Sequence, residues 1–309
     1  MWTDFFYARK LKEFTMKKIF KLFTVLMALF MLVGLTGCFF FNTPEPSDPT
    51  EMNIDSAEKL VAFLSNGSGL GTLTTNIDLY ETASIPAGTE TAKTLDLAGY
   101  SIAYRKETTG PAIRNIGGTL TIQDSSEGKT GKIQNFCNIG GSYAVSVIEG
   151  GTLTLSSSTF KAEQTAVYVG TAQNSTNGGT ATIAGGTNVV ISGECGLGID
   201  EHATVTDLCC TIDAGERAIV NFGTISKISG GSYSAYGDTD NDVYGILNFG
   251  TISNIVTCMI SATNDGNGDA VGIMKMTGST ISQSTLDVDN NITAEVTGSG
   301  TAYKIAQEQ

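Results

Sequence analysis

The sequence repeats itself every 27 residues over its last third, and this repeat limits the possible fold more than any other feature. Residues 218–226 (AIVNFGTIS) recur as residues 245–253 (GILNFGTIS), and a weaker third copy begins at Gly272. Similar small and apolar openings occur farther back, at Ala112, Ala144, Ala166 and Gly198. Seven copies therefore cover residues 112 to about 295, with spacings of 32, 22, 32, 20, 27 and 27 residues.

Each copy contains short runs rich in Val, Ile and Thr, separated by Gly, Asn or Asp, which is typical of short strands. No copy has room for a ten-residue helix, and a propeller blade needs about 40 residues. No proline follows Pro111, which favours uninterrupted sheet because proline cannot donate to a strand ladder. We therefore predict an all-β protein, a right-handed parallel β-helix solenoid of about seven or more coils, in which each coil stacks on the previous one.

The repeat also predicts which side chains stack in columns along the solenoid. The predicted columns are Asn115, Asn221 and Asn248; Ile219, Ile246 and Ile273, facing inward; and Cys210 with Cys258, two coils apart. Stacked Asn side chains can hydrogen-bond from coil to coil. Two coils span about 10 Å, beyond the reach of a disulfide, so we expect both cysteines to be free thiols.

An N-terminal capping helix is predicted from residue 55 onward. Asp55 is the expected N-cap with Glu58 at the third helical position, and Leu60, Val61, Phe63 and Leu64 follow at helical spacing. The strand-like segments 76–79 (NIDL) and 95–102 (LDLAGYSI) come next, and the repeated GGTLTI pattern begins at Gly117. Together these segments resemble bacterial surface proteins of the pectate-lyase-like superfamily, over residues 53 to 305. The resemblance indicates the fold but does not specify the activity, since such scaffolds carry lyases, glycosidases, adhesins and spacers.

The N-terminal region has the pattern of an export signal. Met16 is followed by two lysines and an apolar run over residues 19–35, and residues 35–38 (LTGC) resemble the bacterial lipobox. That resemblance implies that Cys38 is lipidated and becomes the mature N-terminus; an uncleaved membrane anchor is the alternative. The expected organisation is 1–15 start-site extension, 16–37 lipoprotein signal peptide, 38–52 tether and 53–309 β-helix domain. We expect an extracytoplasmic protein, lipid-anchored to the bacterial cell envelope with the membrane as a partner through Cys38.

The charge and the cysteine content argue against nucleic-acid binding, a complete set of disulfides and a Cys/His metal site. The mature part carries 12 Lys and Arg against 29 Asp and Glu, so nucleic acid, which requires clustered basic residues, is not an expected partner. Cysteines other than Cys38 number five, which excludes complete disulfide pairing within one chain. No Cys/His metal spacing is present, and the single histidine, His202, is interpreted as a loop residue.

Two acidic turns, one repeat apart, are the main candidate site. Asp238, Asp240 and Asp242 are followed 27 residues later by a turn with Asp265 and Asp269. Stacking would bring up to five carboxylates together, an oxygen-rich arrangement that suits calcium or a glycan. The alternative is that these residues only form solvated turns.

Nearby aromatic residues extend this candidate site. Tyr233, Tyr236 and Tyr244 could stack on sugar rings, whereas Phe222 and Phe249 are assigned to the core. Enzymes of the resembling superfamily use paired acids or an Arg or Lys base, and we identify no catalytic residues of that pattern. The expected function is that of a binding module (adhesin-like or glycan-binding) or a structural module. The rivals are a polysaccharide lyase or glycoside hydrolase that uses the acidic turns, with calcium as its cofactor, and a spacer without a ligand.

Overall fold

The computed structural model describes residues 51–238, 240–256 and 258–282, and the backbone of 292–297 and 301–305. Contacts divide the chain into two units, 1–48 and 49–309. The signal peptide, the lipidation site Cys38 and residues 38–50 of the tether lie outside the described residues. No helix among the residues that are described is both long and apolar enough to cross a membrane.

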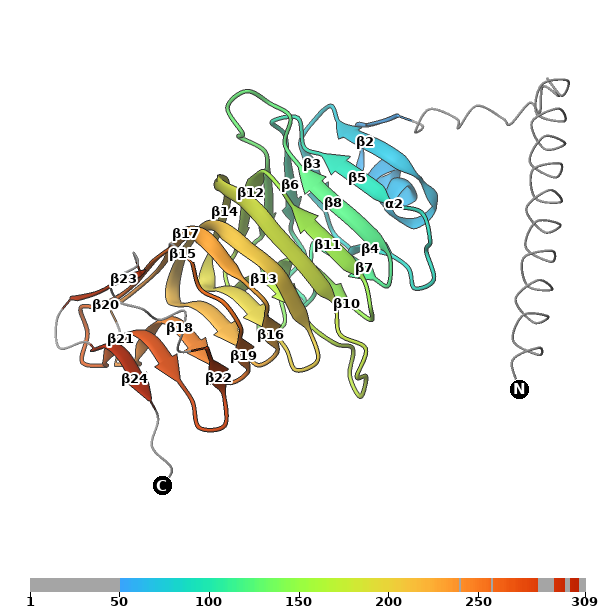
Figure 1. Ribbon diagram of the computed structural model, residues 1–309. Coiled ribbons are helices and arrows are strands. Elements are labelled where there is room, and N and C mark those ends of the chain that lie inside the picture. The colour runs from blue at the N-terminus through green and yellow to red at the C-terminus, as the bar shows by residue number, and fades with distance from the viewer. Residues whose placement is uncertain (1–50, 239, 257, 283–291, 298–300, 306–309) are drawn as a thin grey trace, which may run out of the picture. The chain divides into compact units, whose positions relative to one another are not determined.

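The described chain is a parallel β-helix, which confirms the predicted fold class (Figure 1). Every strand pairing between successive coils is parallel, and each coil contributes one strand to each of three sheets, which we name A, B and C. The register defines nine coils, from β2–β4 to β22–β24. Seven or more coils were expected.

The strands of each sheet follow in coil order. Sheet A contains β1 (Met52–Ile54), β2 (Gly69–Leu73), β5 (Lys93–Asp96), β8 (Thr119–Gln123), β11 (Thr152–Leu155), the first parts of β14 (Thr180–Ile199) and β15 (Thr204–Asn221), β16 (Thr224–Ile225), β19 (Thr251–Ile252) and β22 (Thr280–Ile281). Sheet B contains β3 (Ile77–Leu79), β6 (Ser101–Tyr104), β9 (Lys132–Asn135), β12 (Ser158–Ala162), the middle parts of β14 and β15, β17 (Ile228–Gly237), β20 (Cys258–Asn264) and β23 (Ile292–Thr297). Sheet C contains β4 (Ala83–Ile85), β7 (Ile113–Ile116), β10 (Tyr143–Ile148), β13 (Thr165–Val169), the last parts of β14 and β15, β18 (Val243–Asn248), β21 (Ala270–Lys275) and β24 (Thr301–Ile305).

Inward-facing aliphatic side chains fill the interior along the whole stack. Ile219, Ile246 and Ile273 pair in register and are buried, as predicted. The spacing assigned to the fifth coil was wrong by two residues: Leu197, not Ile199, pairs with Ile219. Residues two apart on a strand face the same side, so the apolar pattern alone fits both registers.

The predicted Asn column is present in sheet C. Asn115, Asn221 and Asn248 are fully buried, and the last two are neighbours in successive coils. Asn221 Nδ2 donates to Asn248 Oδ1 at 2.7 Å, and Asn248 Nδ2 donates to the carbonyl oxygens of Gly250 (3.1 Å) and Thr280 (3.3 Å). These amides bind the corner between sheets C and A across consecutive coils.

The capping helix α2 (Ala57–Asn66) covers the first coil, as predicted, with two differences in detail. Its N-cap is Ser56 rather than Asp55, and Ser56 Oγ accepts a hydrogen bond from the Lys59 N–H at 3.3 Å. Val61, expected on the apolar face, is 38% exposed, whereas three other apolar side chains are buried. Those three are Leu60, Phe63 and Leu64.

The predicted cysteine column is also present. Cys210 pairs with Gly231, and the next residue of that strand, Ser232, pairs with Met259, so Cys258 lies in the same column two coils farther on. All five cysteines of the described region are free. Burial raises the pKa of Cys258 to about 12, and burial beside Cys209 raises the pKa of Cys210.

We expect the buried thiols to resist alkylation. Because the thiolate is the reactive form, Cys210 and Cys258 should label much more slowly than half-buried Cys209 in the native protein. Mass spectrometry of peptides after brief treatment with iodoacetamide measures this, and labelling in denaturant provides the control. Equal alkylation rates of Cys209 and Cys210 in the native protein would contradict the burial described.

Candidate functional site

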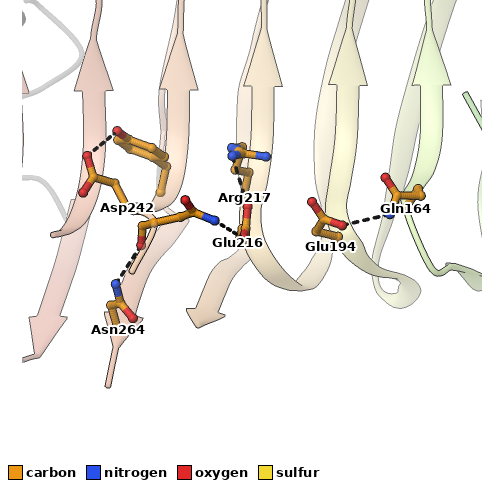
Figure 2. A network of polar contacts seen from close by, with 8 residues as sticks. Gln164, Glu194, Glu216, Arg217, Asp242 and Asn264 are labelled. Atoms are coloured by element: carbon orange, nitrogen blue, oxygen red, sulfur yellow. Dashed lines mark hydrogen bonds and ion pairs between the residues drawn. The ribbon is translucent and has the colours of Figure 1, made fainter. Parts of the chain in front are cut away.

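An acidic corner runs along the solenoid where the chain turns from sheet B to sheet C. We use the name acidic corner for the turns of the fourth to eighth coils, which contribute Glu163, Glu194, Glu216, Asp238, residues 240–242 and residues 264–269. Figure 2 shows part of this corner, with polar side chains from successive coils bonded to one another. The parallel stack repeats the same corner in each coil, so acids far apart in sequence become neighbours.

The two predicted acidic turns lie in adjacent coils. Asn267 Nδ2 donates to Asp240 Oδ1 at 2.7 Å, and the Asp269 N–H donates to Asp242 Oδ1 at 2.9 Å. Each of these pairs is separated by 27 residues. The turns therefore stack at the distance that the sequence period indicates.

Two tyrosines donate hydrogen bonds to carboxylates of these turns. Tyr236 donates its hydroxyl to Asp265 Oδ2 at 2.7 Å, and Tyr244 donates to Asp242 Oδ2 at 2.9 Å. The hydrogen bond to Asp265 raises the pKa of Tyr236, while burial and the bond to Asp242 raise the pKa of Tyr244 to about 12. Each neutral phenol stabilises the carboxylate that it contacts by donating a hydrogen bond, without adding a positive charge.

Side-chain hydrogen bonds also connect the corner residues of the earlier coils. Gln164 Nε2 donates to Glu194 Oε2 at 2.9 Å, Asn241 Nδ2 donates to Glu216 Oε1 at 3.1 Å, and Arg217 forms an ion pair with Glu216 at 3.0 Å (Figure 2). Amide donors and one guanidinium thus hydrogen-bond the carboxylate oxygens in this part of the corner. In the described part of the chain, no three or more His, Cys, Asp or Glu side chains group as metal ligands.

A groove of about 590 Å³ lies beside the acidic corner, over the fourth to seventh coils. Its polar side chains are five carboxylates, one lysine, one serine and one tyrosine, and the other lining residues are alanine and glycine. The lining residues that carry polar or aromatic side chains are Lys161, Glu163, Ser192, Glu194, Asp213, Glu216, Tyr236 and Asp238. Tyr236 is 53% exposed, so its ring is available at the groove despite its bond to Asp265.

Two aromatic assignments from the sequence were wrong. Tyr233, expected near a sugar, is fully buried between Ile212 and Ile260, and its hydroxyl donates to the Leu208 carbonyl at 3.1 Å. Phe222 and Phe249, assigned to the core, are 48% and 36% exposed and stack on each other with centroids 4.4 Å apart. The preceding Asn side chains face inward, so each Phe, one residue later, faces outward.

His202 lies in an exposed turn with a positive φ of 65°. Its neighbour Asp200 accepts hydrogen bonds from the hydroxyls of Tyr168 at 2.8 Å and Thr171 at 3.1 Å. The Tyr168 ring in turn stacks on Tyr143. This arrangement ties coils together and agrees with the interpretation of His202 as a loop residue.

Sequence reasoning missed Glu163, Glu194 and Glu216, which extend the acidic corner by three coils. A sequence signal existed for Glu194 and Glu216, because each follows a strand-like segment that contains Val, Ile or Thr, whereas the segment before Glu163 (STFKA) has one Thr only. Their spacings of 31 and 22 residues hid the relation, since the turns differ in length from coil to coil. The corner position, rather than a constant period, is what these residues share.

The class of this protein is defined by its fold. The described chain is an all-β parallel β-helix with a capping helix at its first coil. No protein-family model, curated protein or solved structure matches this chain.

Proposed function

We propose that the protein is a lipid-anchored β-helix binding module of the bacterial cell surface, adhesin-like or glycan-binding, whose ligand lies in the groove beside the acidic corner. The groove, with its exposed tyrosine ring among hydrogen-bonding carboxylates, is the observation that carries the proposal. Concave sites with a few placed polar groups are where small ligands bind. The lipobox at residues 35–38 supports attachment through Cys38, and the resemblance to pectate-lyase-like surface proteins supports this class.

The groove chemistry favours neutral or amine-bearing sugars. Glu163, Glu194 and Asp213 accept hydrogen bonds from sugar hydroxyls or ammonium groups, whereas Lys161 is the single cation lining the described groove. Anionic polysaccharides would meet like charges there, which costs affinity. An aromatic ring adds a flat surface on which a sugar ring can stack.

Replacement of Tyr236 by Ala tests the role of the ring. We expect binding of chito-oligosaccharides to weaken about tenfold, equivalent to about 1.4 kcal/mol, because one aromatic contact contributes about 0.5–1.5 kcal/mol beyond its buried area. Calorimetric titration of the full-length chain in detergent measures the change. Tyr80→Ala, at an exposed tyrosine of the loop after β3, is the matched control and should bind as the native protein does.

Glu194→Gln tests the charge preference of the same groove. This variant should bind partly de-N-acetylated chito-oligosaccharides more weakly while its affinity for the fully acetylated forms changes little, because only the former carry ammonium groups. Glu201→Gln, at an exposed position of another corner, is the control. The proposal would be overturned if the native protein bound neither form of chito-oligosaccharide, or if it preferred polyuronates.

The alternative function is a polysaccharide lyase or glycoside hydrolase that uses the stacked acidic turns with calcium. The stacking of Asp240 and Asp242 against Asn267 and Asp269 is the observation that favours it. Product release from polyuronates or host glycans, lost in Asp240→Asn or Asp269→Asn, would establish this alternative. Calorimetric heat on addition of calcium, reduced in the same variants, would identify the cofactor.

A further inference from the structure

The outer surface of sheet A carries two parallel columns of hydroxyl side chains, which we call the threonine face. In seven successive coils the segment Thr-X-Thr or Thr-X-Ser places both hydroxyl residues outward and a buried aliphatic residue between them. The first column contains Thr119, Thr152, Thr180, Thr204, Thr224, Thr251 and Thr280, and the second contains Thr121, Thr154, Thr182, Thr206, Ser226, Ser253 and Ser282. All fourteen residues are half-buried or exposed, and neither column contains a charged side chain.

The backbone holds the first column in constant register. From the fourth coil to the ninth, each threonine N–H of this column donates to the carbonyl of the residue before its counterpart in the previous coil. Those six distances lie between 2.7 and 3.0 Å, from Thr152 to Thr280. The columns therefore continue unbroken although the coils differ in length, because the length differences are absorbed elsewhere in the coil.

The backbone ladder also holds the last three coils of the second column, where the N–H groups of Ser226, Ser253 and Ser282 donate to carbonyls of the previous coil at 2.8–3.1 Å. At the irregular step, between Ala181 and Thr182, the backbone register pairs Thr182 with Asp207. The side chain of Thr206 nevertheless lies against Thr182, with the two hydroxyl oxygens 2.7 Å apart. Threonine is stiff at its first side-chain torsion, so the hydroxyl and methyl groups of the eleven threonines form a fixed array; the last three residues of the second column are serines.

The dimensions of this array are close to those of ordered water. Neighbouring strands lie about 4.8 Å apart, and residues two apart on a strand about 6.7 Å. Water oxygens hydrogen-bonded at about 2.75 Å in a tetrahedral network repeat at about 4.5 Å between second neighbours and at about 7.3 Å along the stacking direction of the layers. Each of the two spacings of the hydroxyl array thus differs from the corresponding repeat of the water network by about a tenth or less.

We propose that the threonine face is an ice-binding surface. Each hydroxyl both donates and accepts, as each lattice water does, and an uncharged face complements an uncharged crystal, whereas the acidic corner carries the carboxylates. Many weak contacts on one rigid face act together only when the partner has the same repeat, so a crystal surface engages the array and liquid water does not. This inference concerns a different surface from the groove and is independent of the function proposed for it.

The test is freezing of the full-length chain in detergent, with the detergent buffer as blank. We expect the native protein to enter a slowly growing ice hemisphere and to depress freezing below melting. Thr180→Lys places a long charged side chain in the middle of the face and should abolish both effects. Thr159→Lys, at an outward threonine of sheet B in the neighbouring coil, is the matched control and should retain them.

Circular dichroism establishes that both variants are folded before freezing. Exclusion of the folded native protein from ice, as an ordinary solute is excluded, would overturn the proposal. Adsorption to insoluble chitin or cellulose through this face, together with exclusion from ice, would overturn it in favour of a crystalline glycan. Equal loss of activity in Thr159→Lys would also overturn it, because the effect would then not belong to the threonine face.

Discussion

Replacement of Asp124 by Ala is expected to lower the free energy of unfolding by about 3–5 kcal/mol. Asp124 is 1% exposed and its carboxylate accepts backbone N–H groups from Gly99 (2.8 Å), Ser126 (3.1 Å) and Gly131 (2.5 Å). Its removal leaves these donors without their acceptor, and a buried unsatisfied group costs about 1–3 kcal/mol. Denaturant unfolding at neutral pH measures the loss.

The stabilisation by Asp124 should also depend on pH. Burial alone would raise the pKa of this carboxyl, but the hydrogen bonds from Gly131, Ser126 and Gly99 outweigh burial and lower it. A carboxyl whose folded pKa lies below its unfolded value stabilises the fold above the unfolded value, near 3.9. That stability is lost as pH falls through the folded pKa.

Two comparisons separate this effect from general acid unfolding. The difference in stability between native protein and Asp124→Ala should narrow on acidification below about pH 4. Asp213→Ala removes an exposed carboxylate of equal charge and should change stability by no more than about 0.5 kcal/mol. A loss in Asp124→Ala no larger than that of the control would contradict the role assigned to the buried carboxylate.

The period predicted the fold because a parallel stack converts sequence distance into height along one axis. The 27-residue step placed Ile219 over Ile246 and Asn221 over Asn248, and the structure confirms both. The same logic failed at Ile199, because a strand repeats its facing every two residues and Leu197 has the same character. Register within a coil is therefore fixed by packing and turn geometry that the period does not contain.

The candidate site was predictable only where the period is regular. The stacking of the turns at Asp240 and Asp269 followed from one step of 27 residues. Glu163, Glu194 and Glu216 are separated by 31 and 22 residues rather than 27, and the outward direction of Phe222 depends on where the corner begins. Side-chain direction at a corner is set by the local backbone path, so neither hydropathy nor spacing specifies it.

The second large effect is expected for Asn248, where the stack is tied together by side chains. Asn248→Leu removes the acceptor at 2.7 Å from Asn221 Nδ2 and the donor to the carbonyls of Gly250 and Thr280. Asn221 keeps one bond, to the Thr251 carbonyl at 3.2 Å, and the Gly250 carbonyl keeps the Thr280 N–H at 2.9 Å. The Thr280 carbonyl and one amide hydrogen of Asn221 lose their partner. At about 1–3 kcal/mol for each buried group left unsatisfied, the expected loss is about 3 kcal/mol.

A double-mutant cycle with Asn221→Leu separates the ladder from simple loss of packing. Residues in direct contact are coupled by about 0.5–3 kcal/mol, so the double variant should lose less stability than the two single variants together. Ser234→Ala, which removes a half-buried surface hydroxyl bonded to Ser261, is the control. Additive losses in the cycle would mean that the bond between the Asn221 and Asn248 side chains contributes no coupling, and that each amide acts only through its bonds to backbone carbonyls. The side-chain ladder would then not be a source of cohesion between successive coils.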